Sequence, residues 1–337
     1  MLHVDSVKHA MIRNWGSGLL AGIGLLVTIL PATVFAQAYP SRLVKMTVPF
    51  SAGGSIDLLG RLVGKKMEEG LGVTVVIENK GGGGGTIGTK AVLDSKPDGS
   101  SIAIVSPGPT TVAAVLDPTL QYNITRDITY IVALASYVPA LVAGLQVPGR
   151  TLREFIDYAK KNPGKLTFGS AGVGSSTHIL GELFVRAAGV DIVHVPFKGG
   201  SGGIQDVLGG HISLMITSLV AAQPLINSGK VRALAAFDKE RYPTFPTVPA
   251  VTEDMPNFDP PIIWYGLIGP AGMPAAITDR LNREAIKAMA SAELQKEIIN
   301  GAYKVIGGSP RDFQELIRKD VTVVGDIVRA AKITLEK

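Results

Sequence analysis

The sequence predicts an α/β protein that folds into two lobes. Short apolar runs alternate with segments of helical periodicity, which is the pattern of an α/β domain. A glycine-rich turn follows an apolar run at residues 49–57 and again about 120 residues later, at residues 169–178. Two proline-rich passages divide the chain, and its 337 residues are enough for more than one lobe.

Eight apolar runs are expected to be β-strands because each is short and bounded by turn residues. They are residues 44–48, 73–77, 102–105, 131–135, 166–168, 192–195, 214–216 and 231–236. The last part of the chain is expected to be mostly helical, with Pro274 at one helix start and Ser309 as the N-cap of another. No strand is expected to alternate with these helices.

The two proline-rich passages, residues 138–149 and 242–261, are interpreted as crossings between the lobes. The first lobe is then expected to contain residues 39–142 and 251–337, and the second lobe residues 143–250. The two crossings are together expected to form the hinge between the lobes.

Residues 1–38 have the features of an export signal. Lys8 and Arg13 precede an apolar stretch at residues 19–30, and small residues follow at Ala36 and Ala38. Cleavage after Ala36 and cleavage after Ala38 both fit, and an uncleaved anchor stays open as an alternative. The mature protein is therefore expected outside the cytoplasm.

Composition excludes several classes of function. Removal of the leader leaves a net charge of about +4 with scattered basic residues, which argues against a nucleic-acid binder. The chain has no cysteine, so disulfides, thiolate zinc sites and cysteine nucleophiles are excluded. Outside the leader, His178, His194 and His211 lack metal-binding spacing. No metal and no cofactor are expected.

The two glycine-rich turns predict an anion site with two sides. Each follows a strand and leads into an apolar helix face, at residues 56–67 and 180–187. Glycine allows close approach of the backbone, and unpaired N–H groups at a helix start favour a carboxylate or a phosphate. The alternative is that both are ordinary capping turns, with Ser55 and Ser175 or Ser176 as N-caps.

Two enzyme-like alternatives come from local motifs. Residues 83–88 match the GxGxxG pattern of dinucleotide sites, but five successive glycines, 81–85, satisfy such a pattern easily and no suitable acidic residue follows. A secreted serine hydrolase would use Ser170 or Ser175 with His178, although no GxSxG motif is present.

Three charged or titratable residues have open roles. His178 could reach the cleft or bond a neighbouring loop, and Asp57 could support the helix dipole or meet a ligand ammonium or hydroxyl. Lys198 could contact a carboxylate or be solvated.

Six ordered motifs resemble the extracytoplasmic receptors of tripartite tricarboxylate transporters, the Bug-type family. The motifs are residues 48–50 with Gly53, Gly54 and Asp57; residues 75–80; residues 169–178; residues 195–199; residues 246–249 with Glu253; and residues 264–267 with 270–272 and Pro274. The chain departs from the family in its five-glycine run, which usually includes a proline and an alanine, and at Phe197, where a tyrosine is common.

The resemblance implies a type II periplasmic binding protein without enzymatic activity, located in the periplasm and expected to be a monomer. Its two lobes would close on a small carboxylate, an organic acid or an amino acid, for delivery to the membrane subunits of a transporter. The ligand-binding positions that it implies are Phe50, Ser51, Ala52, Gly53, Gly54 and Asp57 on one lobe, and Ser170, Ala171, Gly172, Ser175, Thr177 and His178 on the other, with Ser106 and Lys198 as additional candidates.

Overall fold

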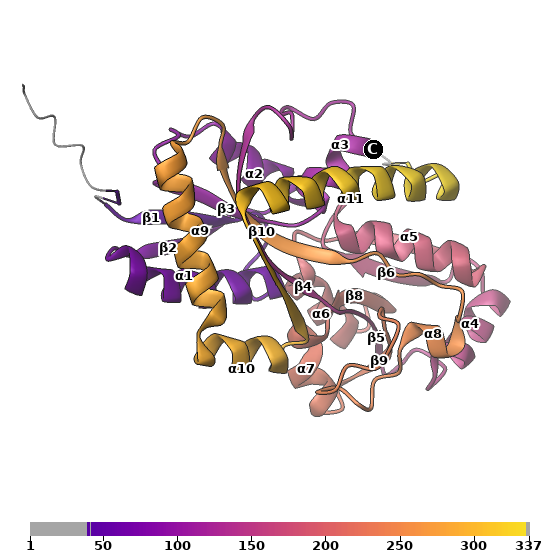
Figure 1. Ribbon diagram of the computed structural model, residues 1–337. Helices are drawn as coiled ribbons and strands as arrows, with labels where there is room; N and C mark the ends of the chain where they lie inside the picture. Colours follow the sequence, from indigo (N-terminus) through magenta and orange to yellow (C-terminus); the bar gives the residue numbers. More distant parts are fainter. Residues whose placement is uncertain (1–38, 41, 335–337) are drawn as a thin grey trace, which may run out of the picture. The chain divides into compact units, whose positions relative to one another are not determined.

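The computed structural model describes residues 39–40 and 42–334, which contain two β-sheets with helices around them (Figure 1). The predicted export signal and both cleavage sites lie outside the described residues. The expected two-lobed α/β architecture is confirmed, and every predicted strand overlaps an observed strand.

The first sheet has six strands in the order β11-β4-β10-β3-β1-β2. Its strands are β1 Val44–Val48, β2 Val75–Asn79, β3 Ser101–Val105, β4 Ile128–Tyr137, β10 Ile263–Pro270 and β11 Tyr303–Gly307. Strand β1 pairs in parallel with β2 and β3, whereas β10 pairs antiparallel with both β3 and β4. All residues of β3 are buried, as expected for a strand covered on both faces.

The second sheet has five strands in the order β7-β6-β8-β5-β9. Its strands are β5 Pro139–Gly144, β6 Leu166–Ser170, β7 Ile192–Pro196, β8 Leu214–Ser218 and β9 Val231–Ala236. Strand β6 lies in parallel between β7 and β8, and β5 lies antiparallel between β8 and β9. The C-terminal ends of the parallel strands β6, β7 and β8 therefore lie at one edge of this sheet.

Helices follow the strands in both halves (Figure 1). They are α1 Ser55–Leu71, α2 Thr86–Leu93, α3 Ala113–Leu116, α4 Leu152–Lys161, α5 Ser176–Ala188, α6 Gly200–Leu208, α7 Leu219–Asn227, α8 Val251–Asp254, α9 Ala275–Ala290, α10 Ala292–Asn300 and α11 Pro310–Ala331. Two short helical turns, η1 Gly83–Gly85 and η2 Gly108–Val112, precede α2 and α3.

The chain passes between the sheets twice. Strand β4 ends at Tyr137 in the first sheet and β5 begins at Pro139 in the second, so the first passage is the single residue Val138. The second passage runs from the end of β9 to the start of β10. The predicted lobe boundary at residues 142/143 thus falls inside β5, and the predicted boundary at 250/251 falls inside the second passage.

Strand β5 was not expected because prolines flank its apolar residues, and Pro139 is its first residue. A proline is tolerated at the first residue of a strand, where its missing N–H is not needed. All six residues of β5 are buried between β8 and β9, so packing outweighs the local turn signal.

The expectation that no strand alternates with the C-terminal helices was wrong. Strand β11 lies between α10 and α11 and pairs antiparallel with β4 at the edge of the first sheet. Four of its five residues are not buried, with Val305 and Ile306 both exposed. An edge strand of five residues with this exposure has no continuous apolar run that would identify it in the sequence.

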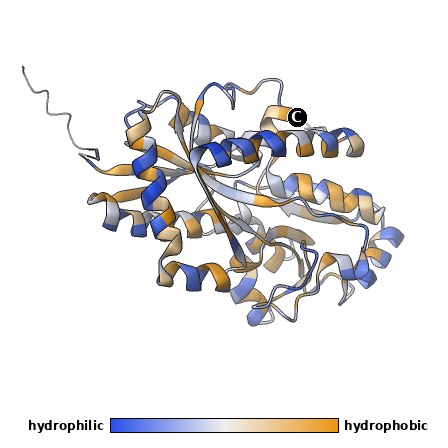
Figure 2. Ribbon diagram, viewed as in Figure 1, coloured by the Kyte–Doolittle hydropathy of each residue, from blue (hydrophilic) through white to orange (hydrophobic). Residues whose placement is uncertain are grey.

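The last helix, α11, packs against the first sheet, and its N-cap residue is Ser309 as predicted. The Ser309 hydroxyl accepts a hydrogen bond from the Asp312 N–H, and the Asp312 carboxylate accepts one from the Ser309 N–H, which forms a capping box. Hydrophilic and hydrophobic residues alternate along the helix with helical periodicity (Figure 2). Phe313 packs edge-to-face against Tyr130 and Trp264 of the sheet.

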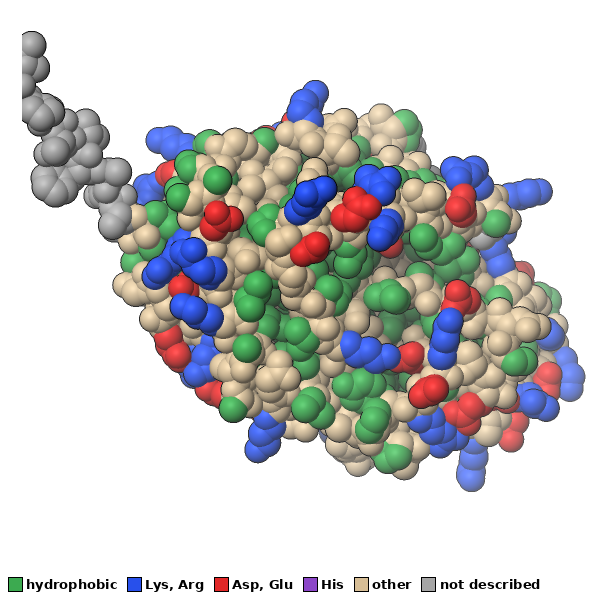
Figure 3. Space-filling model, in the orientation of Figure 1, with side chains coloured by type: hydrophobic (Ala, Val, Ile, Leu, Met, Phe, Trp, Pro, Cys, Tyr) green, Lys and Arg blue, Asp and Glu red, His purple; other side chains and the backbone are tan. Residues whose placement is uncertain are grey.

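Charges of both signs are interspersed over the visible face of the molecule, without a large patch of one sign (Figure 3). Within residues 39–40 and 42–334, no helix is both long and apolar enough to cross a bilayer.

The contact between α11 and the first sheet is testable with Phe313→Ala. Phe313 is buried, and only a glycine at position 266 leaves room for its ring, since a Cβ there would lie 2.2 Å from the ring. Truncation is expected to lower the free energy of unfolding by about 3–5 kcal/mol in urea denaturation. Val323→Ala, on an exposed position of the same helix, is the control and should change it by less than about 0.5 kcal/mol.

Candidate ligand-binding site

The two glycine-rich turns lead into helices whose N-termini have different caps. Helix α1 begins at Ser55, and its N-cap residue Gly54 provides no side-chain acceptor for the first amides. Helix α5 begins at Ser176, where the Ser175 hydroxyl accepts a hydrogen bond from the His178 N–H as predicted. The first amide groups of α1 therefore lack a side-chain partner, which leaves them available to an anion.

A cavity between the two sheets brings the turns together. Its volume is about 50 Å³, which is room for a few water molecules or a compact solute. The first sheet and its loops contribute Phe50, Ser51, Gly54, Ser55, Ile56, Ser106, Tyr137 and Tyr265. The second contributes Ala171, Ser175, Ser176, Thr177, Gly200, Ile216, Thr217 and Ser218.

The lining is polar but uncharged. Among the described residues that line the cavity, none carries a formal charge. The N-termini of four helices, α1, α5, α6 and α7, reach it through Ser55, Ser176, Gly200 and the N-cap residue Ser218. Each N-terminus carries a partial charge of roughly +0.5, so the cavity favours a negatively charged occupant without any cationic side chain.

Two hydroxyl groups at the cavity have no partner in the described part of the protein. Ser106 and Thr217 are each 4% exposed, and no hydrogen bond of either side-chain oxygen is recorded among these residues. Thr217 lies next to the α6 N-terminus, since a Cβ on Gly200 would be 2.8 Å from its hydroxyl. A hydroxyl can donate and accept hydrogen bonds, so both groups are available to a ligand in the cavity.

The cavity includes half of the predicted binding positions. Phe50, Ser51, Gly54, Ser106, Ala171, Ser175 and Thr177 line it, whereas Ala52, Gly53, Asp57, Ser170, Gly172, His178 and Lys198 do not. The sequence interpretation missed Ser55, Ile56, Tyr137, Ser176, Gly200, Ile216, Thr217, Ser218 and Tyr265. The available signal was Thr217-Ser218, which follows a predicted strand as the two glycine-rich turns do.

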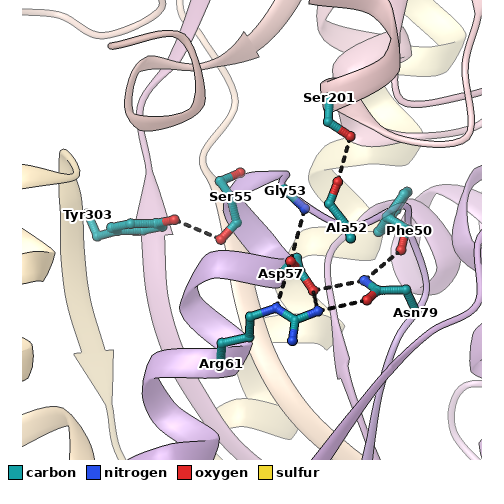
Figure 4. Close-up of polar contacts among 9 residues, drawn as sticks. All are labelled: Phe50, Ala52, Gly53, Ser55, Asp57, Arg61, Asn79, Ser201 and Tyr303. Carbon is teal, nitrogen blue, oxygen red and sulfur yellow. Dashed lines mark hydrogen bonds and ion pairs between the residues drawn. The ribbon is translucent and has the colours of Figure 1, made fainter. Parts of the chain in front are cut away.

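Asp57 supports the first turn instead of facing the cavity (Figure 4). Its Oδ2 accepts hydrogen bonds from the Gly53 N–H at 2.9 Å and from Arg61 Nε at 3.0 Å. Its Oδ1 accepts from Arg61 Nη2 and from Asn79 Nδ2, and Asn79 also donates to the Phe50 carbonyl. Burial acts to raise the pKa of Asp57, but these hydrogen bonds outweigh burial and lower it.

Tyrosines from three neighbouring strands close one side of the cavity. The Ser55 hydroxyl shares a hydrogen bond of 2.7 Å with the Tyr265 hydroxyl, and Tyr303 donates to the Ser55 carbonyl (Figure 4). Tyr137 stacks on Tyr265 with ring centroids 4.9 Å apart. Burial raises the pKa of Tyr137 and Tyr265, so both hydroxyls stay neutral. The Ser55 side chain is thereby directed to Tyr265.

Neither serine of the hydrolase alternative is hydrogen-bonded to the ring of His178. The Ser170 hydroxyl bonds His194 Nε2 at 2.7 Å, and the Ser175 hydroxyl bonds the His178 backbone and Thr177. Ser170 is fully buried, so a substrate has no access to its oxygen. His178 Nδ1 accepts a hydrogen bond from the Gly174 N–H, which is the structural role weighed for it.

His178 and His194 form a stacked pair behind the second turn. Their ring centroids are 4.0 Å apart, and both rings line a separate cavity together with Glu182 and Arg186. Burial lowers the pKa of His178 to about 4. Burial, with repulsion from His178, lowers the pKa of His194 to about 3. Both imidazoles are therefore neutral at pH 7 and serve as hydrogen-bond partners of the turn.

Lys198 contributes its backbone, and its side chain is exposed. The Ser51 N–H donates to the Lys198 carbonyl at 2.9 Å. Close by, the Ser201 hydroxyl donates to the Ala52 carbonyl at 2.8 Å (Figure 4). The first turn thus directly contacts Lys198, which precedes α6, and the first turn of α6 itself, across the boundary between the two sheets.

The fold and the cavity define the class of protein: a two-lobed periplasmic binding protein. Residues 59–333 match the family model described as tripartite tricarboxylate transporter family receptor. The chain belongs to this family, which is one of solute-binding receptors.

Relatives agree with this assignment. The chain is 34% identical over 307 residues to a Pseudomonas sp. (strain P51) protein from the tcbD-tcbE intergenic region, with 90% of each chain covered. It is 32% identical to protein BugT of Bordetella pertussis, covering 92% of this chain and 96% of BugT.

Solved structures show the same fold. The periplasmic binding protein BugD superposes with a TM-score of 0.84 at 31% identity, covering 88% of this chain and 99% of BugD. MatC from Rhodopseudomonas palustris, solved with bound malate, gives a TM-score of 0.82 at 30% identity, covering 86% of this chain and all of MatC. A further R. palustris protein, solved with adipate, gives 0.83 at 28% identity, covering 88% of this chain and 99% of that protein.

The histidine pair predicts a pH dependence of stability. Because each folded-state pKa lies below the unfolded value of about 6.5, the folded protein binds fewer protons, and stability is retained above pH 6.5 and lost as the pH falls. Between pH 6.5 and 5, each histidine should lower the free energy of unfolding by about 1.4 kcal/mol for each pH unit of acidification. Urea denaturation at several pH values measures this slope.

His194→Gln is expected to reduce this slope, and exposed His211→Asn is the control that should leave it unchanged. A slope that is the same in wild type and in His194→Gln would contradict the role of the pair.

Proposed function

We propose that this protein is an extracytoplasmic receptor that encloses a small carboxylate in the cavity between its lobes and delivers it to the membrane subunits of a tripartite transporter. It acts in the periplasm after export through the leader at residues 1–38. The protein performs no chemistry on its ligand: the turns and helix ends bind and orient the carboxylate, and hinge opening releases it.

The observation that carries this proposal is the uncharged cavity with four helix N-termini around it. Amide dipoles at the ends of α1, α5, α6 and α7 supply a positive potential in a site whose lining residues are mostly buried. A carboxylate accepts hydrogen bonds from such groups in several directions, whereas an ammonium group would meet the wrong end of each dipole. The family membership and the relatives with bound malate and adipate support the same ligand class.

The size of the cavity supports a compact ligand. Its roughly 50 Å³ and its tyrosine wall leave little space beyond the carboxylate in the conformation described. Tyr137, Tyr265, Thr217 and Ser218 provide neutral hydroxyl groups for the remainder of the ligand. Hydroxyls can donate or accept, so they suit a ligand with further polar groups.

Binding is testable by thermal shift of the mature protein against a panel of organic acids and amino acids, each paired with its primary amide. A ligand at 100 times its Kd stabilises the folded state by about 2.7 kcal/mol. At least one acid is expected to raise the Tm and its amide to leave the Tm unchanged, because only the acid carries the charge. If no acid in the panel raises the Tm, the receptor function is contradicted.

The cavity itself is testable with Thr217→Val. The substitution removes a hydroxyl without a protein partner while retaining the shape of the side chain. Affinity for the most stabilising acid of the panel should fall about tenfold, which is the value of one hydrogen bond, without a loss of free energy of unfolding. Thr217→Ser keeps the hydroxyl and is the matched control. Equal affinities of Thr217→Val and wild type would place the ligand elsewhere.

A further inference from the structure

The five-glycine run, residues 81–85, meets the second lobe through bare backbone. Four of its glycines, Gly82 to Gly85, have positive φ angles. Gly84 faces the turn before α5: a Cβ at this position would lie 2.4 Å from the Val173 carbonyl oxygen and 3.0 Å from the Ser175 nitrogen. These atoms belong to the backbone of the loop that also lines the ligand cavity, so they cannot rotate away as a side chain would.

The same absence of side chains recurs along the boundary. A Cβ on Gly81 would lie 3.0 Å from the Lys198 carbonyl, and a Cβ on Gly108 would lie 3.1 Å from the Ser175 Cα. A Cβ on Gly199, which comes from the second lobe, would lie 3.0 Å from the Ser51 nitrogen. Contacts in which an added methyl group would force the opposite backbone to shift therefore follow the boundary on both sides of the cavity.

Hydrogen bonds between the lobes accompany these close approaches. The Ser51 N–H donates to the Lys198 carbonyl, beside Gly81 and Gly199. The Gly108 N–H donates to the Ser176 hydroxyl at 3.1 Å, beside Gly84. The Ser201 hydroxyl donates to the Ala52 carbonyl beside the first turn (Figure 4). All of these donors and acceptors are backbone groups or serine hydroxyls, which reach each other only if the two backbones lie close together.

We propose that Gly81 and Gly84 are positioning residues for ligand capture, because they allow the lobes to close backbone on backbone over the cavity. This inference rests on the enclosure of a carboxylate proposed above. Neither residue lines the cavity. Gly84 sets how closely the turn at residues 171–175 approaches the loop after β2, and Gly81 sets how closely Lys198 approaches it. Together they determine how completely the helix ends surround the ligand.

The steric argument distinguishes Gly84 from its neighbour Gly83. Both have left-handed φ angles, +61° and +56°, so an alanine at either position carries a similar backbone penalty. A Cβ on Gly83 would come closest to the Thr86 hydroxyl, at 2.5 Å, and this side chain belongs to the same lobe and can change rotamer. Gly83→Ala is therefore a matched control for Gly84→Ala.

The experiment measures closure directly. The chain has no cysteine, so Lys65→Cys and Lys230→Cys, both exposed and on opposite lobes, give unique sites for spin labels. Distances between the labels are measured by pulsed electron paramagnetic resonance in buffer, in L-malate and in adipate. Wild type is expected to show a short-distance population in at least one of these conditions.

Gly84→Ala should lose most of the short-distance population, whereas Gly83→Ala should change it by less than about twofold at a similar Tm. Gly81 does not have a left-handed φ angle, so the Gly81→Ala protein should fold fully. It should nevertheless lose part of the short-distance population. A Gly84→Ala protein that closes as Gly83→Ala does would overturn the inference, as would a wild type without the short distance. Both outcomes are read from the distance between the spin labels and do not depend on a thermal shift by any acid. A failure of the proposed function is therefore recognised separately, in the thermal-shift experiment.

Discussion

The structure depends on backbone amides at helix N-termini that point into a cavity without a cation. Helix α1 starts after Gly54, which offers no capping side chain, and Ser55 directs its hydroxyl to Tyr265 instead. The amide groups thus keep their bonding capacity for a ligand, at the expense of the stability that a cap would add. An arginine would bind a carboxylate more strongly but would also fix its geometry, whereas amides and hydroxyls accept acids of different shape.

Such a site needs rigid loops, and buried polar groups outside the cavity supply the rigidity. The Asp57 carboxylate joins Gly53, Arg61 and Asn79, and so fixes the first turn to both α1 and β2. On the other lobe, His178 and His194 hold Gly174 and Ser170. The charged and titratable groups near the turns therefore position the backbone of the proposed binding site, while the lining of the cavity is uncharged.

Sequence analysis predicted those parts of the fold and site that have local signals. Strand, turn and helix alternate within a few residues around 44–63 and 166–187, so periodicity identifies both turns. Strand β11 and the roles of Asp57 and His194 depend on partners far away: β4 is more than 160 residues from β11, and Asn79 follows Asp57 by 22 residues. The wall at Tyr137, Thr217 and Tyr265 has no glycine-rich signature, because strand ends place these side chains at the cavity only after both sheets have formed.

The insertion of β10 between β3 and β4 has a consequence for biogenesis. Strands β3 and β4 are separated by only about twenty residues of chain, yet each has an unsatisfied edge until residues 263–270 arrive. The five strands of the second sheet form one uninterrupted segment, 139–236, and can pair earlier. In synthesis from the N-terminus, all strands of the second sheet are available once residue 236 has been made, whereas the first sheet stays incomplete until β10 and β11 follow.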